Sequence, residues 1–286
     1  MRASSRHPDH AGAPGAVLAY DLETIAPPMP DGSFPPWPTH VPVAAGFAEA
    51  RQRDGEWTFY IAALVVSGHT EEADLIREAD RRMATAQVVT SYNGRQFDAL
   101  VLRLAAQRNR VWNLKAIADH AAANRFGGEH ADLADLYSSH GRKVSLAAIA
   151  EQIGIPIKTD IAGGDVAALW EQGETERIRR YVAEDALATL VLWFAWPASR
   201  AADEAIVTRP MAALARHLER TPDLAHLSAF VDCALMRWCR PRALHADIAA
   251  ALDRVAAKLR REEDERAFAT ALPPPPASIS SARPSS

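Results

Sequence analysis

The stretch at residues 16–24, Ala-Val-Leu-Ala-Tyr-Asp-Leu-Glu-Thr, constrains the fold most. Its uncharged start is built of small, β-branched and aromatic residues, which predicts a buried strand. Asp21 and Glu23 follow at its far end, two residues apart. Because side chains alternate between the two faces of a strand, both carboxylates point to the same face. Two such acids raise each other's pKa, and a divalent cation between them would remove the repulsion.

An Asp-x-Glu pair by itself is more often a strand end with solvated acids, so a metal site requires further carboxylates. Residues 91–98, Ser-Tyr-Asn-Gly-Arg-Gln-Phe-Asp, provide the next one. A strand ends here, Asn93-Gly94 turns the chain, and Asp98 begins a helix. An isolated acid at this place is a plausible helix cap. The junction of a strand and its helix is also where α/β sheets place their sites.

The third motif lies on a long helix that we expect at residues 174–194. Tyr181 and Asp185 are four residues apart, so they share one face of that helix. The alternative interpretation is a partly buried tyrosine whose hydroxyl meets water. Three motifs in this order nevertheless indicate an acidic site assembled from a first strand, a strand–helix junction and a late helix.

Composition limits the class of protein. The chain has 286 residues, of which 48% are hydrophobic and 24% charged, enough for one domain of roughly 150–200 residues and an appendage. The net charge of −4 excludes a protein that coats nucleic acid by charge alone, so any such contact is local. No apolar run is long enough to span a membrane, and the N-terminus lacks a secretory signal. The two cysteines, Cys233 and Cys239, form neither a disulfide scaffold nor a Cys-x-x-Cys motif. We therefore expect a cytoplasmic protein.

The remaining pattern predicts an α/β fold with a mixed five-stranded sheet flanked by helices and followed by a helical C-terminal extension. Strands at 43–50 and 56–66, joined by a turn at 53–55, complete a three-stranded meander with the first strand. A helix capped by Thr70 and ending at Met83 then leads to a parallel strand at 87–92. Further helices are expected at 97–109, 114–125, 145–153 and 165–172, and an edge strand at 131–137.

The proline-rich segment at 26–42 cannot form a helix or a central strand, so it predicts a long surface loop. Its Phe34 and Trp37 either line a substrate groove or, as we favour, pack the loop down. We divide the chain into a disordered N-terminus, a domain with the three motifs, a helical extension and a disordered, proline-rich tail. The respective ranges are 1–14, 15–196, 197–270 and 271–286.

Taken together, Asp-x-Glu, Asn-Gly-x-x-Phe-Asp and Tyr-x-x-x-Asp resemble the motifs of the DnaQ-like 3′–5′ exonucleases of the ribonuclease H-like superfamily, in the subgroup with tyrosine in the third motif. The chain is most similar to predicted exonucleases related to the proofreading domain of family-B DNA polymerases, over residues 16–196. The resemblance implies a ribonuclease H-like fold. It also implies two Mg²⁺ or Mn²⁺ ions, a catalytic Tyr181 that orients the attacking water, and four metal-binding acids: Asp21, Glu23, Asp98 and Asp185.

The resemblance further assigns substrate contacts. Asn93 and Phe97 correspond to residues that hold the terminal nucleotide, although a role of Phe97 in the core is equally open. Lys158 is the expected contact to the nucleic-acid backbone, and Arg95, Arg142 and Lys143 are further basic candidates. His130 is interpreted as a structural histidine and is left out of the metal set.

The expected function is a metal-dependent 3′–5′ exonuclease that acts on the 3′ end of single-stranded nucleic acid, with DNA favoured. One alternative is a 3′–5′ exoribonuclease of the same fold, because the carboxylate chemistry does not depend on the sugar and discrimination needs contacts to the 2′-hydroxyl. The other is a catalytically silent nucleic-acid-binding or scaffold module. The complete set of four acids favours an enzyme, since a silent protein is free to lose them.

Overall fold

A computed structural model describes residues 15–67, 70–124, 129–138, 144–157 and 163–271. The chain forms two compact units, residues 1–241 and 242–286. The domain boundary that we expect after residue 196 stays a prediction, as do the disordered ends at 1–14 and 271–286. The two ends lie almost wholly outside the described residues. The helices that follow residue 197 begin within the first unit.

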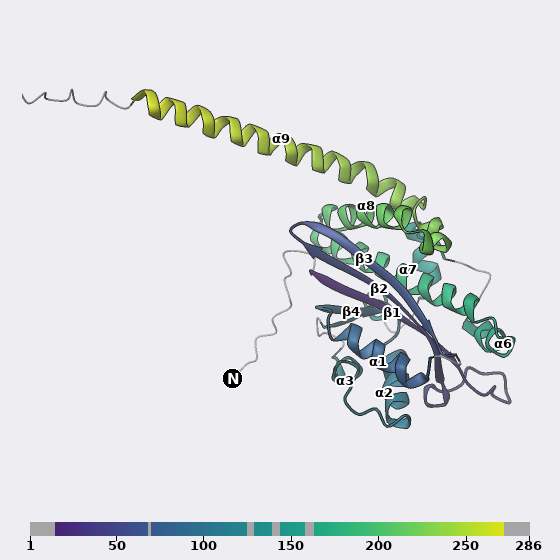
Figure 1. Cartoon of the computed structure of the whole chain (residues 1–286). Coiled ribbons are helices and arrows are strands. Elements are labelled where there is room, and N and C mark those ends of the chain that lie inside the picture. The colour runs from purple at the N-terminus through teal and green to yellow at the C-terminus, as the bar shows by residue number, and fades with distance from the viewer. Residues whose placement is uncertain (1–14, 68–69, 125–128, 139–143, 158–162, 272–286) are drawn as a thin grey trace, which may run out of the picture. The chain divides into compact units, whose positions relative to one another are not determined.

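The first unit is built on one mixed five-stranded sheet (Figure 1), as predicted. Its strands are β1 (Ala16–Ile25), β2 (Val41–Arg53), β3 (Glu56–Val65), β4 (Val88–Ser91) and β5 (His130–Asp132). Their order in the sheet is β3-β2-β1-β4-β5. β1, β2 and β3 pair antiparallel, whereas β4 is parallel to β1 and β5 is parallel to β4. The turn between β2 and β3 has positive φ at both Asp54 and Gly55, as a two-residue hairpin requires.

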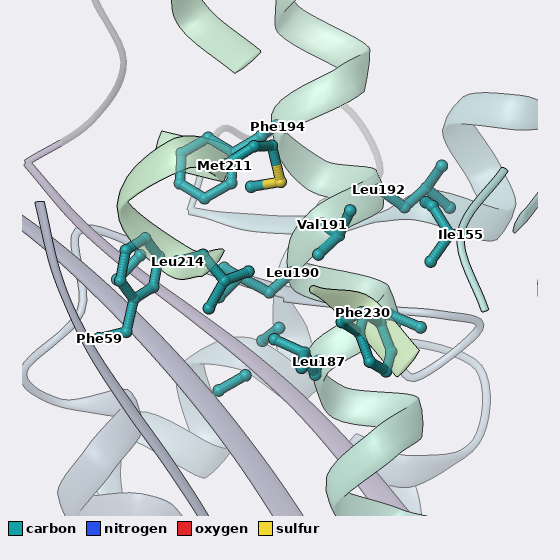
Figure 2. Close-up of a cluster of buried hydrophobic side chains, with 14 of the residues drawn as sticks. Phe59, Ile155, Leu187, Leu190, Val191, Leu192, Phe194, Met211, Leu214 and Phe230 are labelled. Atoms are coloured by element: carbon teal, nitrogen blue, oxygen red, sulfur yellow. The ribbon is translucent and has the colours of Figure 1, made fainter. Parts of the chain in front are cut away.

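Helices cover both faces of the sheet, because alternate residues of β1 face opposite sides. Leu18, Tyr20 and Leu22 pack against α1 (Glu72–Met83), α2 (Asp98–Arg108) and α3 (Lys115–Ala122). Val17 and Ala19 face α7 (Thr175–Ala201) and α8 (Ala205–Arg220) on the other side (Figure 1). Figure 2 shows this second core, in which Leu187, Leu190 and Phe194 of α7 meet Met211 and Leu214 of α8.

The remaining elements are short, apart from the last helix. They are η1 (Trp37–Thr39), α4 (Leu133–Tyr137), α5 (Leu146–Ile153), η2 (Gly163–Asp165), α6 (Val166–Glu171), η3 (Pro222–Phe230) and α9 (Ala234–Ala271). The α5 helix lies within the range 145–153 expected for it: Ser145 caps it, and Gly154 ends it with a positive φ of 77°. α9 begins in the first unit and forms the described part of the second. No helix in the described part of the chain is long and apolar enough to cross a membrane.

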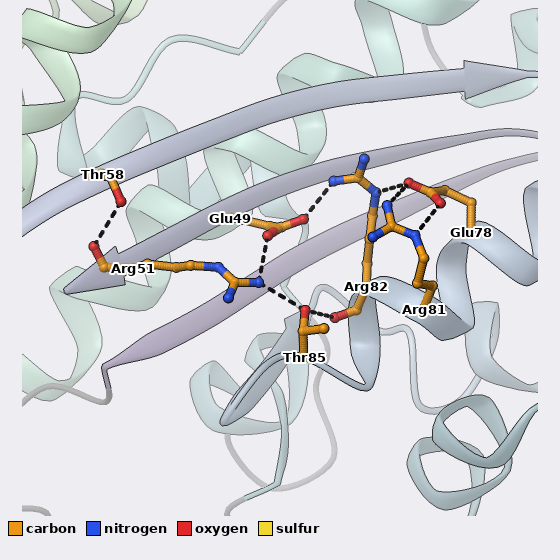
Figure 3. A network of polar contacts seen from close by, with 7 residues as sticks. All are labelled: Glu49, Arg51, Thr58, Glu78, Arg81, Arg82 and Thr85. Carbon is orange, nitrogen blue, oxygen red and sulfur yellow. Dashed lines mark hydrogen bonds and ion pairs between the residues drawn. The ribbon is translucent and has the colours of Figure 1, made fainter. Parts of the chain in front are cut away.

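A buried arginine of α1 contacts strands β2 and β3 (Figure 3). The guanidinium of Arg82 bonds Glu49 of β2 at 2.6 Å and Glu78 of α1 at 2.7 Å. It also lies over the rings of Phe47 and Tyr60, 5.0 and 4.6 Å from their centroids. Both carboxylates and both rings compensate the burial of this charge.

The structure corrects the expectation that the proline-rich loop extends to residue 42. Strand β2 begins at Val41, and Pro42 pairs with Thr24 even though β2 lies between β3 and β1. The pairing register shifts between Glu23 and Thr24 at this point. A bulge leaves a residue without a ladder partner, which is where a sheet tolerates a proline.

Three element boundaries also differ from the predictions. Thr70 pairs with Ser67 in a bridge instead of capping α1, and Glu71 takes the cap position. The expected edge strand at 131–137 ends at Asp132, because the Asp132 side chain accepts a hydrogen bond from the Ala134 amide and starts α4. Helix α7 continues through Pro197 to Ala201, since the buried Ala198 keeps its last turn packed.

Candidate metal centre

Three carboxylates from two distant elements of the first unit converge at one place. Asp21 and Glu23 extend from β1, and Asp185 extends from α7. One oxygen of each carboxylate lies within 4.8 Å of the others, and only 7% of Glu23 is exposed. Three oxygen donors at this spacing fit a hard divalent cation such as Mg²⁺ or Mn²⁺.

A glycine allows α7 to approach the sheet at this point. Gly46 of β2 lies directly opposite Asp21 of β1 in the register. A Cβ atom built on Gly46 would lie 2.0 Å from the carbonyl oxygen of Val182. The α7 backbone therefore rests on the backbone of β2, and Tyr181 and Asp185 are carried to the edge of β1. Gly46 was not among the predicted site residues, although a glycine inside a strand pattern indicates a close backbone approach.

Asp98, in the first turn of α2, is not one of the three carboxylates within 4.8 Å of one another, but its charge acts on Asp21 and Glu23. It is 5% exposed, and the space for its carboxylate depends on Gly94. A Cβ atom at Gly94 would lie 2.9 Å from Oδ2 of Asp98 and 2.5 Å from Oγ of Ser91. Burial, followed by the charge of Asp132, raises the pKa of Asp98 to about 8.

The site concentrates negative charge. Burial and then the charges of Glu23, Asp185 and Asp98 raise the pKa of Asp21 well above its usual value. Burial, Asp185 and Asp98 do the same for Glu23. The pKa of Asp185 is raised to about 6 by burial, against the lowering effect of the Tyr181 hydroxyl. The four acids thus destabilise one another electrostatically, and bound cations would relieve this cost.

Tyr181 lies one turn before Asp185 on the same helix. Burial and the charges of Asp185, Glu23 and Asp21 raise the pKa of Tyr181 well above its usual value. The hydroxyl therefore keeps its proton at neutral pH. It can donate or accept a hydrogen bond at the site, but it cannot act as a base there.

A comparison with known protein families agrees with this geometry. A family model described as "Predicted 3′-5′ exonuclease related to the exonuclease domain of PolB" matches residues 32–234. The chain belongs to this family. The matched range starts after β1, so the model includes Asp98, Tyr181 and Asp185 but neither Asp21 nor Glu23. It continues past residue 197 through α8 and η3.

Two solved structures match parts of this chain. A family B DNA polymerase from the hyperthermophilic archaeon Pyrobaculum calidifontis has 20% sequence identity and a TM-score of 0.45, covering 76% of this chain and 27% of the polymerase chain. An ExoI/SSB-Ct complex has 17% identity and a TM-score of 0.32, covering 61% of this chain and 43% of that one. The chain therefore spans less than half the length of either. No curated protein matches it.

Asp132 organises the loop that presents Asn93 in this member of the exonuclease family. Its carboxylate accepts hydrogen bonds from the amides of Asn93, at 2.8 Å, and of Arg95, at 3.1 Å. These bonds hold the turn between β4 and α2, in which Asn93 has a positive φ of 65°. No role was predicted for Asp132. The local sequence offers one signal for it, an acid directly before a short apolar segment.

Arg95, one of the basic candidates for a phosphate contact, is paired within the protein. Its guanidinium donates to the carbonyl of Ala123 at 3.0 Å and pairs with Asp135 at 3.2 Å, and its side chain is 15% exposed. Arg95 instead ties the loop to α3 and α4. The other basic candidates, Lys158, Arg142 and Lys143, lie outside the described residues.

His130 is placed as a structural histidine would be. It is buried beside β4, with Nε2 2.8 Å from the Ser91 hydroxyl and Nδ1 3.3 Å from the carbonyl of His120. Burial lowers its pKa to about 4, so the ring is neutral. The cluster of carboxylate donors does not include it.

Phe34, His40 and Phe97 form a cluster of aromatic side chains. The ring of Phe97 contacts His40 edge-on, with centroids 4.8 Å apart, and Phe34 stacks on His40 at 5.0 Å. His40 is anchored by a 2.6 Å hydrogen bond to Thr24, one residue after Glu23. Phe97 and Trp37 pack partly against the core, which is the favoured alternative for Trp37, whereas Phe34 is 75% exposed.

Proposed function

We propose that this chain is a metal-dependent 3′–5′ exonuclease that hydrolyses phosphodiester bonds at the 3′ end of single-stranded nucleic acid, with DNA as the favoured substrate. The observation that carries the proposal is the convergence of Asp21, Glu23 and Asp185 within 4.8 Å. Membership of a family of predicted 3′–5′ exonucleases supports the same reaction.

In this proposal Asp21, Glu23, Asp98 and Asp185 hold two Mg²⁺ or Mn²⁺ ions. Bound ions of this kind lower the pKa of the attacking water and stabilise negative charge on the leaving 3′ oxygen. The protonated hydroxyl of Tyr181 orients the water. The buried carboxylates keep their geometry because α7 rests on β2 at Gly46, which pairs with Asp21 of β1.

The terminal nucleotide lies against Asn93 and the aromatic group of Phe34, His40 and Phe97. Phe34 is the exposed member of this group, so the side of its ring that does not stack on His40 can stack on a base, an interaction worth about 1–3 kcal/mol. Lys158 remains the proposed backbone contact from the sequence. The overall charge of −4 agrees with a substrate held locally rather than by a broad basic surface.

Labelled single strands test the proposed reaction. We expect a 5′-labelled DNA strand to shorten in single-nucleotide steps and a 3′-labelled strand to release its label at once. Cleavage should require Mg²⁺ or Mn²⁺ and stop in EDTA. RNA of the same sequence, assayed alongside, measures the preference for the sugar. Absence of cleavage from both strands, or release of the 5′ label first, would contradict the proposal.

The buried acids of the site should make the stability of the metal-free protein depend on pH. The pKa is about 6 for Asp185 and about 8 for Asp98, above the value of about 4 for an unfolded aspartate. A carboxyl group whose pKa is raised in the folded protein contributes its full stabilisation below about pH 4. This stabilisation is lost as the pH rises through the pKa of the folded state. We therefore expect the Tm in EDTA to fall by several degrees between pH 5 and pH 8, since each pKa unit corresponds to about 1.4 kcal/mol.

Added Mg²⁺ or Mn²⁺ should raise the Tm more at pH 8 than at pH 5, because protons compete with cations for the carboxylates. Asp98→Asn is the matched control, as it removes the group with the pKa of about 8. Its Tm in EDTA should fall less over the same pH range. An identical pH profile for this variant, or an equal metal effect at both pH values, would argue against the site. Differential scanning calorimetry provides the measurement.

A further inference from the structure

The second unit carries an exposed apolar stripe along one helix. From residue 242 onward, α9 presents five aliphatic side chains whose exposed fractions range from 49% for Ile248 to 64% for Leu252. The five are Leu244, Ile248, Leu252, Val255 and Leu259. The proposed nuclease reaction uses none of them. A stripe of this kind on a surface helix indicates a partner.

The geometry of the stripe favours another helix as that partner. Its residues recur at intervals of four, four, three and four. At about 100° per residue they fall within about 80° of the helix circumference. A helix that packs on a domain core usually shows a wider apolar face, whereas a narrow stripe is typical of a coiled-coil seam.

Charge distinguishes between the possible occupants. Residues 242–268 contain six basic and six acidic side chains. The basic ones are Arg242, Arg254, Lys258, Arg260, Arg261 and Arg266, and the acidic ones are Asp247, Asp253, Glu262, Glu263, Asp264 and Glu265. An anionic lipid surface or a nucleic-acid backbone requires an excess of basic residues, which this segment lacks. Two copies of a segment without net charge do not repel each other.

We propose that a second copy of this chain covers the stripe, with the two α9 helices packed in parallel and in register. In this arrangement four of the five stripe residues form the seam: Leu252 and Leu259 occupy the a positions of the heptad, and Ile248 and Val255 occupy the d positions. Leu244 precedes the seam at a g position. Lys258 then lies at g and Glu263 at e of the following heptad. These two positions face each other across a parallel pair, so each seam gains two complementary ion pairs.

The flanking residues of the stripe are compatible with this register. Ala251, directly before Leu252, occupies a g position, and Ala256 occupies the e position that follows. Small side chains at these positions let two helices approach. Lys258 lies 3.8 Å from Glu262 on its own helix and its side chain is 73% exposed, so it can reach the partner helix. The parallel arrangement therefore needs no rebuilding of the helix.

Analytical ultracentrifugation of the full chain over a hundredfold range of concentration tests the proposal. We expect the wild-type mass to rise to at least two copies. The double variant Leu252→Glu/Leu259→Glu should weaken association by at least about 100-fold, because its carboxylates would be buried in the seam without partners. Arg261→Glu is the control, since it changes the net charge equally on the opposite side of the helix. It should associate like the wild type.

Two further variants test the orientation. Lys258→Glu should weaken association, because it places a carboxylate against Glu263 of the other copy. The double variant Lys258→Glu/Glu263→Lys should restore association. Leu259→Cys should form a disulfide between copies under mild oxidation, which an antiparallel pair would prevent. A monomeric wild type, or a double glutamate variant that still associates, would overturn the proposal. Cleavage of labelled DNA by the same samples reports separately on the proposed nuclease function.

Discussion

Asp185→Asn is expected to reduce cleavage by about 10⁴-fold or more without unfolding the protein. The amide keeps the shape of the side chain but removes one charge from the cluster that Asp21 and Glu23 complete. Metal ions contribute several kcal/mol to the stabilisation of such a transition state, and about 1.4 kcal/mol corresponds to a factor of ten in rate. In EDTA the variant should melt at least as high as the wild type at pH 8, because one buried charge is gone.

The control for this variant lies on the same helix. Glu176→Gln removes an exposed carboxylate that pairs with Arg179 and Arg180, and its activity should stay near that of the wild type. Tyr181→Phe should retain measurable, metal-dependent cleavage, because it deletes only an orienting hydroxyl, worth about 10²–10⁴-fold. Full activity of both Asp185→Asn and Tyr181→Phe would show that α7 does not take part in the reaction.

Gly46→Ala is expected to destabilise the fold and to disrupt the site together. The new methyl group would lie 2.0 Å from the Val182 carbonyl oxygen, and a helix backbone cannot move aside as a flexible side chain can. Overpacking of this kind costs about 3 kcal/mol, which lowers the Tm by about 6–12 °C in a chain of this size. Displacement of α7 should also reduce the rate of cleavage by about 10²-fold, because Asp185 and Tyr181 move with the helix.

Gly164→Ala is the matched control for this substitution. It adds the same methyl group where no atom lies within 4 Å, so the Tm should change by less than about 1 °C. Calorimetry and the rate of cleavage of labelled DNA should be measured on the same samples. A Gly46→Ala protein with the Tm and rate of the wild type would mean that α7 does not rest on β2 at this point.

The sequence by itself determined the sheet, the helices and the order of the motifs. Each of these depends on residues close together in the chain. The alternation of residues 16–24 identified β1, the Asp54-Gly55 turn identified the hairpin, and the interval of four placed Tyr181 and Asp185 on one helix face. The local pattern was less reliable at element ends. The side chains of Thr70 and Asp132 can hydrogen-bond to several nearby backbone groups. Which group they bond depends on the surrounding structure.

The tertiary structure alone decided how the acids meet. Asp21 and Asp185 are separated by most of the domain, and their distance depends on the contact between Gly46 and Val182, two residues that no local pattern connects. The same holds for Arg95, whose pairing with Asp135 no local pattern in the sequence indicates. Residue types and intervals predict which side chains have the chemistry. Packing between distant segments decides which of them share a site, because only the folded chain places their backbones within contact distance.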